Sequence, residues 1–204
     1  MPLVERMESD VQVAACQPKI RWQRHKTFFE YAGAAGGFMD RLGFPLCRGR
    51  FMEELETDEG QYDTPIECFW ATGCCMMLRR EIVNQIGLFD DRFFAHMEEI
   101  DYCWRAKNAG YKIVCEPSGM VYHVGGGTLP KGNPRKTYYN FRNSLMMLFK
   151  NLPLWPLITT LFMRLFVIDP LVAMQYILAG QFKSMWAIAR AHWAFFGRIP
   201  QLMQ

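Results

Sequence analysis

Three carboxylates and one histidine give the sequence its densest chemistry. Glu98, Glu99 and Asp101 stand close together, and His123 follows later in the chain. An aromatic run precedes the acids, and a glycine, a turn and two strand-like segments separate them from the histidine. A carboxylate can serve as a general base, and imidazole readily binds Mn²⁺. The stretch from Gly87 to His123 is therefore the candidate active site.

The three acids begin a predicted helix over residues 98–108. Its apolar stripe consists of Ile100, Cys103 and Trp104, and Gly110 ends it. The amino end of a helix favours the ionised form of a carboxylate, so a base held there can face a cleft.

The acids differ in their neighbours along that helix. Asp101 has a structural alternative to catalysis, because Arg105 stands four residues later and can form a surface ion pair. Glu98 lies one turn from Asp101 on much the same side. Glu99 has no cationic partner within the helix.

Other elements must position these residues. Residues 79–86 predict a helix, and Gly87 fits a left-handed residue just past its end. Residues 111–115 and 120–123 predict two short strands with Pro117 as a break between them.

The segments outside the candidate site are simpler. Near the amino end, the pattern predicts a helix and then a short strand over residues 11–16. Residues 21–66 are polar, glycine-rich and irregular, and a loop this long in a compact domain is uncommon unless it covers a site. Residues 138–150 resume helical spacing, with Arg142 and Asn143 opposite the apolar side.

Composition indicates a folded chain. Half of the 204 residues are apolar and aromatic residues reach 15%. The seven cysteines are odd in number and form no C-x-x-C pair, which favours a reducing, cytoplasmic setting and argues against a zinc site. No stripe of alternating basic and aromatic residues runs through residues 1–150, so nucleic acid is not an expected partner.

The last fifty or so residues differ in character from the rest. The whole net charge of +3 comes from this tail, where Asp169 is the single acid. Its basic residues are Arg164, Lys183, Arg190 and Arg198. No uncharged run reaches the ~20 residues of a spanning helix, so we expect amphipathic helices lying in the plane of a membrane surface. The alternatives are a tail that spans the membrane, and a packing arm or dimer surface.

A resemblance to a known family covers residues 1–150 closely and the tail loosely. The ordered set resembles the C-terminal half of the GT-A domain of family 2 glycosyltransferases of the bacterial rhamnosyltransferase-like kind. Its members here are Gly73, Arg79-Arg80, the run from Gly87 to Phe94, Glu98-Glu99-Ile100-Asp101, Arg105, Gly110, Pro117, Tyr122-His123 and Arg142-Asn143. The resemblance implies an α/β fold, a partial GT-A mixed sheet with helices over residues 1–150, followed by an amphipathic helical tail over residues 151–204.

The resemblance also implies an activity. Such enzymes transfer a sugar from a nucleotide-diphospho-sugar donor to a hydroxyl of a glycan or lipid-linked acceptor, usually with inversion, at the cytoplasmic face of the membrane. Inversion needs a carboxylate base and a cation that holds the departing diphosphate. Glu99 occupies the position of the family's catalytic Asp, with a carboxylate one methylene further out. His123 resembles the family's histidine ligand of Mn²⁺ or Mg²⁺; a hydrogen-bonded strand-end histidine is the equal alternative.

The substrate-binding residues follow from the same resemblance. Trp70, Thr72 and Gly73 resemble the loop that borders the acceptor; Trp70 could stack on a sugar, or be a core residue. The candidates for diphosphate contacts are Lys131, Arg135 and Arg142, with solvated surface charge as their alternative.

One part of the family pattern has no counterpart in this sequence. No D-x-D occurs, and the first strands of the nucleotide-binding half have no match. We therefore expect the chain to be the C-terminal portion of a longer enzyme. The alternative function is a catalytically inert, membrane-associated remnant or interaction module with the same fold.

Overall fold

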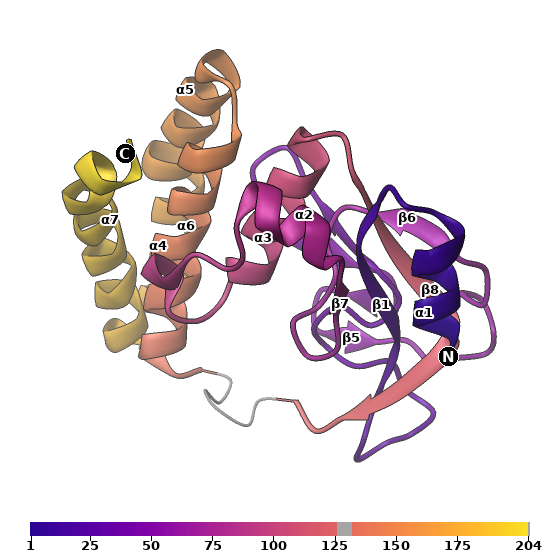
Figure 1. Cartoon of the computed structure of the whole chain (residues 1–204). Helices are drawn as coiled ribbons and strands as arrows, with labels where there is room; N and C mark the ends of the chain where they lie inside the picture. The colour runs from indigo at the N-terminus through magenta and orange to yellow at the C-terminus, as the bar shows by residue number, and fades with distance from the viewer. Residues whose placement is uncertain (126–131, 204) are drawn as a thin grey trace. The chain divides into compact units, whose positions relative to one another are not determined.

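The chain forms two compact units in a computed structural model that describes residues 1–125 and 132–203 (Figure 1). The first unit comprises residues 1–40, 45–90 and 99–125. The second comprises residues 41–44, 91–98 and the described residues from 132 onward. Each unit is considered by itself.

The first unit is built on a four-stranded mixed sheet with the order β6-β8-β1-β7. Its long central strands, β1 (Val13–Trp22) and β8 (Lys112–His123), run parallel. The short outer strands, β6 (Ile66–Cys68) and β7 (Met77–Leu78), pair antiparallel with β8 and β1. The sheet is thus mixed, as the sequence predicted. Trp22 and His123 pair at the carboxyl ends of the two parallel strands, the edge where ligands bind in open α/β sheets.

Helix α1 (Pro2–Ser9) covers one face of this sheet (Figure 1). Met7 packs with Val13, Cys16 and Val114 in a buried cluster, and Leu3 lies against it. The backbone at Gly36 passes close to Cys68 and Cys115: a Cβ atom added at Gly36 would lie 3.3 Å from the Cβ atom of each cysteine. Cys68, Cys103 and Cys115 are buried free thiols, and burial raises the pKa of Cys103 to about 12.

Residues 21–66 hold only small pieces of regular structure, in agreement with the sequence. Two hairpins occur there, β2 (Gly37–Met39) with β3 (Pro45–Cys47), and β4 (Arg50–Phe51) with β5 (Glu54–Leu55). A buried ion network fixes this segment to β1, because Asp58 pairs with Lys19 at 2.9 Å and with Arg21 at 2.6 Å.

The helices that flank the acids lie where the sequence predicted them. Helix α2 (Arg80–Ile86) ends at Gly87, whose φ is +78° and whose N–H bonds to the carbonyl of Val83 at 2.9 Å. A short 3₁₀ turn, η1 (Asp91–Phe93), precedes helix α3 (Glu98–Asn108), and Gly110 follows α3 with φ +88°. Ile100 and Cys103 of the predicted stripe are buried.

The short strand predicted over residues 11–16 is instead the longer β1, Val13–Trp22, and two further boundaries differ from the prediction. Residues 112–123 form one continuous strand rather than two, because the chain passes Pro117 in a register shift: Pro18 pairs with Glu116, and Lys19 pairs with Met120. A bulge of this kind accommodates proline in a strand, because residues 117–119 stand outside the ladder with β1. The second difference is that residues 134–151 belong with the tail helices, so the units do not divide at residue 150.

The second unit is a group of helices side by side (Figure 1). Helix α4 (Pro134–Asn151) packs on α7 (Phe182–Leu202), and between them in sequence lies one helical run made of α5 (Leu154–Met163), the π-helical turn η2 (Arg164–Ile168) and α6 (Asp169–Leu178). Pro170 lacks the amide proton that an α-helical ladder needs, which accounts for the wider turn before it.

The charged residues of that helical run are buried together. The guanidinium of Arg164 donates to Asp169 at 2.8 Å, to the hydroxyl of Ser144 at 2.8 Å and to the carbonyl of Leu42 at 3.0 Å. His192 contacts the other oxygen of Asp169 at 2.9 Å. The Arg164–Asp169 pair therefore joins helices within the unit and adds no charge to its surface.

Candidate active site

The acidic helix start gives each of its three carboxylates a different environment. Glu98 and Glu99 are half-buried in the first turn of α3, whereas Asp101 is fully buried. Burial raises the pKa of Glu98. The side chain of Glu99 lies beside Gly73, where an added Cβ would come within 3.7–3.9 Å of its Cβ, Cγ and Cδ. Since glycine carries no side chain, this side of Glu99 is left uncovered by residue 73.

Asp101 forms the ion pair with Arg105 that its spacing indicated, but in the interior rather than on the surface. The Nε of Arg105 donates to Asp101 at 2.8 Å, and its terminal nitrogens donate to the carbonyls of Ile86, Gly87 and Leu88. A buried carboxylate held by an arginine that also satisfies a helix end is a structural tie. We therefore assign Asp101 to positioning α3 against α2.

The loop from Trp70 to Gly73 is bound to the glycine-rich segment of the first unit. The indole Nε1 of Trp70 donates to the carbonyl of Phe38 at 2.8 Å, and only 5% of Trp70 is exposed. A Cβ at Gly37 would lie 2.1 Å from the indole ring, so the backbone passes directly over it. This arrangement gives Trp70 the core role that the sequence left open, and not an exposed face for stacking on a sugar.

The next two residues of this loop, Thr72 and Gly73, are held in place by hydrogen bonds of Gln17. The N–H of Thr72 donates to Gln17 Oε1 at 2.8 Å, and Gln17 Nε2 donates in turn to the carbonyl of Gly33 at 2.7 Å. Gln17 and Thr72 are both buried. The buried amide of Gln17 thus fixes the loop that brings Gly73 against Glu99.

The residues just before α3 adopt an uncommon backbone conformation. Phe94, His96 and Met97 have φ values of +66°, +69° and +73°. A residue in this conformation lowers the stability of the fold by on the order of 1–3 kcal/mol, so the conformation persists only where surrounding contacts impose it. Strain of this kind clusters at functional sites, which agrees with the placement of the acids directly after it.

Arg142 and Asn143 supply the contacts that impose this conformation. Arg142 donates to the carbonyls of Arg92 and Phe93, and Asn143 Nδ2 donates to those of Phe93, Ala95 and His96 at 2.7–3.0 Å. Both side chains are buried, at 3% and 0% exposure, although the sequence placed them opposite the apolar side of their helix. We therefore assign Arg142 to holding this segment rather than to a diphosphate.

Arg135 remains accessible at the start of α4. Its side chain is exposed, and its guanidinium carbon lies 5.9 Å and 5.8 Å from the ring centres of Phe94 and Tyr139. The side chain of Asn133 caps the helix by accepting the N–H of Arg135. Lys131, the other predicted diphosphate contact, lies outside the described residues.

His123 ends β8 beside a carboxylate that the sequence did not single out. Its Nδ1 is buried and lies 3.5 Å from Oε1 of Glu30. Glu30 is 3% exposed and follows Phe29 in the irregular segment. An acid between two aromatic residues was the sequence signal that could have drawn attention to it.

The residues at this point fit a divalent cation in the kind of donor atoms they offer. One imidazole nitrogen and one carboxylate suit Mn²⁺ better than Mg²⁺, which prefers oxygen alone. Within residues 1–125 and 132–203, no three His, Cys, Asp or Glu side chains converge on one point.

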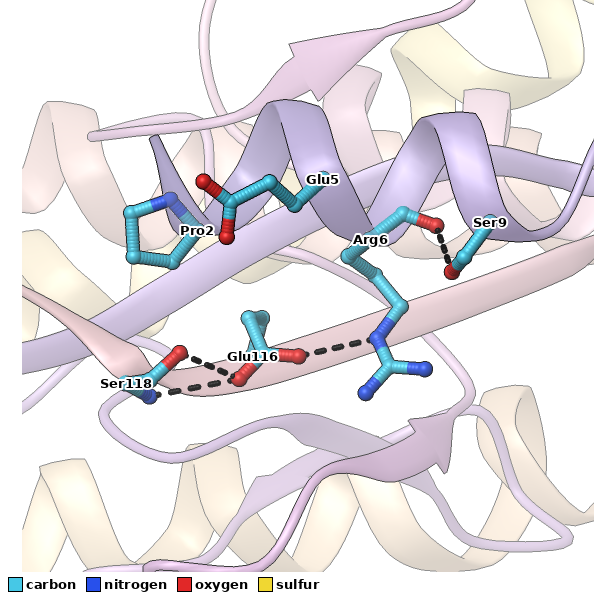
Figure 2. Close-up of a pocket in the computed structure, with 6 residues that line it drawn as sticks. All are labelled: Pro2, Glu5, Arg6, Ser9, Glu116 and Ser118. Carbon is cyan, nitrogen blue, oxygen red and sulfur yellow. Dashed lines mark hydrogen bonds and ion pairs between the residues drawn. The ribbon is translucent and has the colours of Figure 1, made fainter.

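A surface cavity of about 230 Å³ lies elsewhere, beside α1 (Figure 2). It is lined by Pro2, Glu5, Arg6, Ser9, Glu116 and Ser118, none of which the sequence singled out. Arg6 donates to Glu116 at 2.8 Å, and Ser118 donates to its other oxygen. Burial opposes ionisation of Glu116, but these hydrogen bonds outweigh it and lower its pKa. The lining carboxylate is thus already satisfied by protein groups.

Comparisons with known proteins point to one class of enzyme. Over 54 residues the chain is 41% identical to the N-acetylglucosaminyl-diphospho-decaprenol L-rhamnosyltransferase of Mycobacterium tuberculosis (strain CDC 1551 / Oshkosh), a match that covers 26% of this chain and 18% of that protein. It is 26% identical over 119 residues to the dTDP-rhamnosyl transferase RfbF of Shigella flexneri, which covers 53% and 40%. No family profile matches the chain.

A third relative is named as a hexosyltransferase rather than a rhamnosyltransferase. The low-salt glycan biosynthesis hexosyltransferase Agl10 of Haloferax volcanii is 29% identical over 77 residues, 37% of this chain and 25% of that protein. The matches thus span less than half the length of the curated relatives. Over part of its length, the chain is similar to rhamnosyl- and hexosyltransferases.

Proposed function

We propose that the chain is part of an inverting glycosyltransferase of the family 2, GT-A kind. It transfers a sugar from a nucleotide-diphospho-sugar to a hydroxyl of a glycan or lipid-linked acceptor in cell-surface polysaccharide synthesis. The observation that carries the proposal is the start of α3, where Glu99 lies against Gly73 in a chain similar to rhamnosyl- and hexosyltransferases.

Glu99 is the proposed general base. It deprotonates the acceptor hydroxyl, whose oxygen then bonds to the anomeric carbon of the sugar while the bond to the nucleoside diphosphate breaks. The amino end of α3 favours the ionised carboxylate that this step needs. Gly73 keeps one side of Glu99 uncovered, and Gln17 holds the loop that carries Gly73. Glu98, the other half-buried acid of this turn, has a pKa that burial raises, and it is the alternative base.

Each unit, considered by itself, offers one positive group that is proposed to bind a diphosphate. Arg135 is exposed at the first turn of α4 and can form charge-assisted hydrogen bonds to phosphate oxygens. A divalent cation at His123, Mn²⁺ or Mg²⁺, would supply charge stabilisation to the leaving diphosphate when bound.

The helices of the second unit are the proposed membrane contact, at the cytoplasmic face. Residues 154–178 form a helix long and apolar enough to cross a membrane, which the sequence analysis had not expected, and 22% of its most apolar window is buried. Its Arg164–Asp169 pair, however, is packed against protein. A helix held this way in a bundle supports docking in the plane of the surface, as a peripheral rather than a spanning element.

One face of α7 supports the same placement. Lys183, Trp186, Arg190 and Trp193 recur at intervals of three and four residues and are exposed, whereas Ala187, Ile188, Ala191 and Phe195 are buried on the other side. Indole rings between basic side chains are typical of helices at the boundary of anionic membranes. The relative that acts on a decaprenol-linked sugar makes such a surface a plausible place for the acceptor.

Nucleotide binding tests the proposed function directly. Calorimetric titration of the 204-residue chain with dTDP, UDP and GDP in the presence of Mn²⁺ is expected to show saturable binding of one of them. Adenosine diphosphate serves as the control nucleotide. Absence of binding to all three would contradict the proposal and would favour an inert module with the same fold.

A further inference from the structure

The carboxylate of Glu30 is buried beside His123 in an orientation fixed by the backbone. Its Oε2 accepts the N–H of Ala32 at 2.6 Å, which leaves Oε1 directed toward His123. Gly125 lies on the other side of Oε1: a Cβ there would be 2.9 Å from it, and the backbone has φ +68°. Glycine at position 125 therefore gives Glu30 the space to approach the imidazole.

This carboxylate has little to compensate its charge. Glu30 is 3% exposed, and within the part of the chain that the structure describes, His123 is the basic side chain recorded as its ion-pair partner. Removing a carboxylate from water is costly unless a cation and hydrogen bonds replace the solvent. One backbone N–H does not meet that need, so the site calls for a positive charge.

The separation of the two groups indicates what that charge is. At 3.5 Å, Nδ1 of His123 and Oε1 of Glu30 are further apart than the ~2.7–3.2 Å of a good N–H···O hydrogen bond. Two ligands of one small divalent ion, each about 2.1 Å from it and at a right angle, lie roughly 3 Å apart. The buried Nδ1 has no hydrogen-bond partner, as expected of a nitrogen whose lone pair serves a metal ion.

We propose that Glu30 and His123 together bind a divalent cation of the Mn²⁺ class, with Oε1 and Nδ1 as its two protein ligands. Both residues belong to the first unit, at the carboxyl ends of the parallel strands β1 and β8. Two protein ligands leave several coordination positions, which a diphosphate and water can fill. The inference deepens the proposed function, because it names a second protein ligand for the cation that binds the donor.

Mn²⁺ binding by the 204-residue chain without any nucleotide tests the inference. Free Mn²⁺ is followed by electron paramagnetic resonance during titration of the unchanged chain, Glu30→Gln, His123→Ala and the exposed-residue control Glu59→Gln. Glu30→Gln and His123→Ala are expected to weaken Mn²⁺ binding by more than about tenfold, while Glu59→Gln binds as the unchanged chain does. Failure of the unchanged chain to bind Mn²⁺, or equal binding by Glu30→Gln, overturns the proposal.

Gly125→Ala tests the site without removing either ligand side chain. Gly125→Ala retains both ligands but places a methyl group against Oε1 of Glu30, so it too is expected to weaken Mn²⁺ binding. Circular dichroism identifies which variants remain folded, and a folded Gly125→Ala chain with unchanged affinity counts against the site. If the chain binds Mn²⁺ and Glu30→Gln weakens that binding, but no nucleotide binds, the result contradicts the proposed function alone. If a nucleotide binds, but Glu30→Gln leaves Mn²⁺ binding unchanged, the result contradicts this inference alone.

Discussion

Asn143 on α4 donates a hydrogen bond to the carbonyl of Ala95 at 2.7 Å. Through this bond and those to Phe93 and His96, a helix distant in sequence determines the backbone that leads into the acidic helix. Three residues with positive φ lie in the segment from Phe94 to Met97. Within the second unit, the conformation of the segment that ends at Glu98 therefore depends on α4 as well as on the local sequence.

Replacing Asn143 with leucine tests this dependence. Asn143→Leu keeps the number and branching of side-chain heavy atoms but removes the three hydrogen bonds that Asn143 donates and the oxygen that accepts from Arg142 Nε. We expect a loss of about 1–3 kcal/mol in the free energy of unfolding. We also expect the folded Asn143→Leu variant to transfer sugar more slowly, because the segment that leads into α3 moves. Asn140→Leu makes the same change at a half-buried position of the same helix and is expected to cost less than about 0.5 kcal/mol. Equal effects of the two variants in urea unfolding would refute the role of Asn143.

The buried network around Asp58 predicts a dependence of stability on pH. Burial would raise the pKa of Asp58, but hydrogen bonds from Lys19 and Arg21 outweigh it and lower that pKa. A carboxyl group with a lower pKa in the folded state adds stability above its unfolded pKa of about 4 and loses it as the pH falls through the folded pKa. Stability should therefore decline in acid.

Asp58→Asn isolates this contribution. At neutral pH it removes the carboxylate that buried Lys19 shares with partly buried Arg21, while Lys19 keeps its pair with Asp63, and we expect a loss of about 1.5–3 kcal/mol. The difference from the unchanged chain shrinks as the pH falls from about 4, where Asp58 of the unfolded chain takes up a proton, through the lower folded pKa, where Asp58 of the folded chain is protonated as well. Urea unfolding between neutral and acidic pH measures it, with Glu59→Gln as a control in the same loop. A difference that stays constant with pH would show that Asp58 is not ionised in the folded chain.

The exposed face of α7 predicts binding to anionic membranes. Trp186→Ser with Trp193→Ser removes two exposed indoles, each of about 150–250 Å². Because each Å² of apolar surface removed from water contributes about 25 cal/mol, we expect loss of the two indoles to lower the partition of the chain onto phosphatidylglycerol vesicles by more than about tenfold. Lys183→Gln with Arg190→Gln removes mainly the part of binding that salt screens.

A matched control exists in the first unit. Phe51 and Met52 are 71% and 76% exposed on a small hairpin, and Phe51→Ser with Met52→Ser makes a comparable apolar loss. Vesicle sedimentation compares the two double variants. Equal retention of binding by both would exclude α7 as the contact surface.

Local sequence signals were sufficient for the elements around the acids. Helix α3 has the predicted bounds, because its apolar stripe and Gly110 are unambiguous. The break predicted at Pro117 is absent, since a register shift against β1 absorbs the proline, and pairing with a distant strand leaves no trace in the local pattern. The periodicity of α4 indicated its helix but could not show that Arg142 and Asn143 face buried carbonyls.

The candidate site was predictable in part for the same reason. Glu99 could be proposed from its neighbours and from resemblance, but its contact with Gly73 depends on Gln17, far away in sequence. Trp70 could be a sugar platform or a core residue until the backbone at Gly37 was seen to cover its ring. Glu30 has only a weak signal in the sequence, its place between two aromatic residues, and the folding of residues 21–66 brings it to His123.

The central claim is that Glu99 is the general base of a sugar transfer. Release of nucleoside diphosphate from dTDP-rhamnose, UDP-hexose and GDP-hexose donors in the presence of Mn²⁺ tests it most directly, with the unchanged chain, Glu99→Gln, Glu99→Asp and Glu59→Gln compared. We expect release from one donor, a loss of about 10²–10⁴-fold in Glu99→Gln with the fold retained, partial recovery in Glu99→Asp, and no change in Glu59→Gln. Full turnover by Glu99→Gln, in a chain whose unchanged form releases nucleoside diphosphate, would contradict the claim.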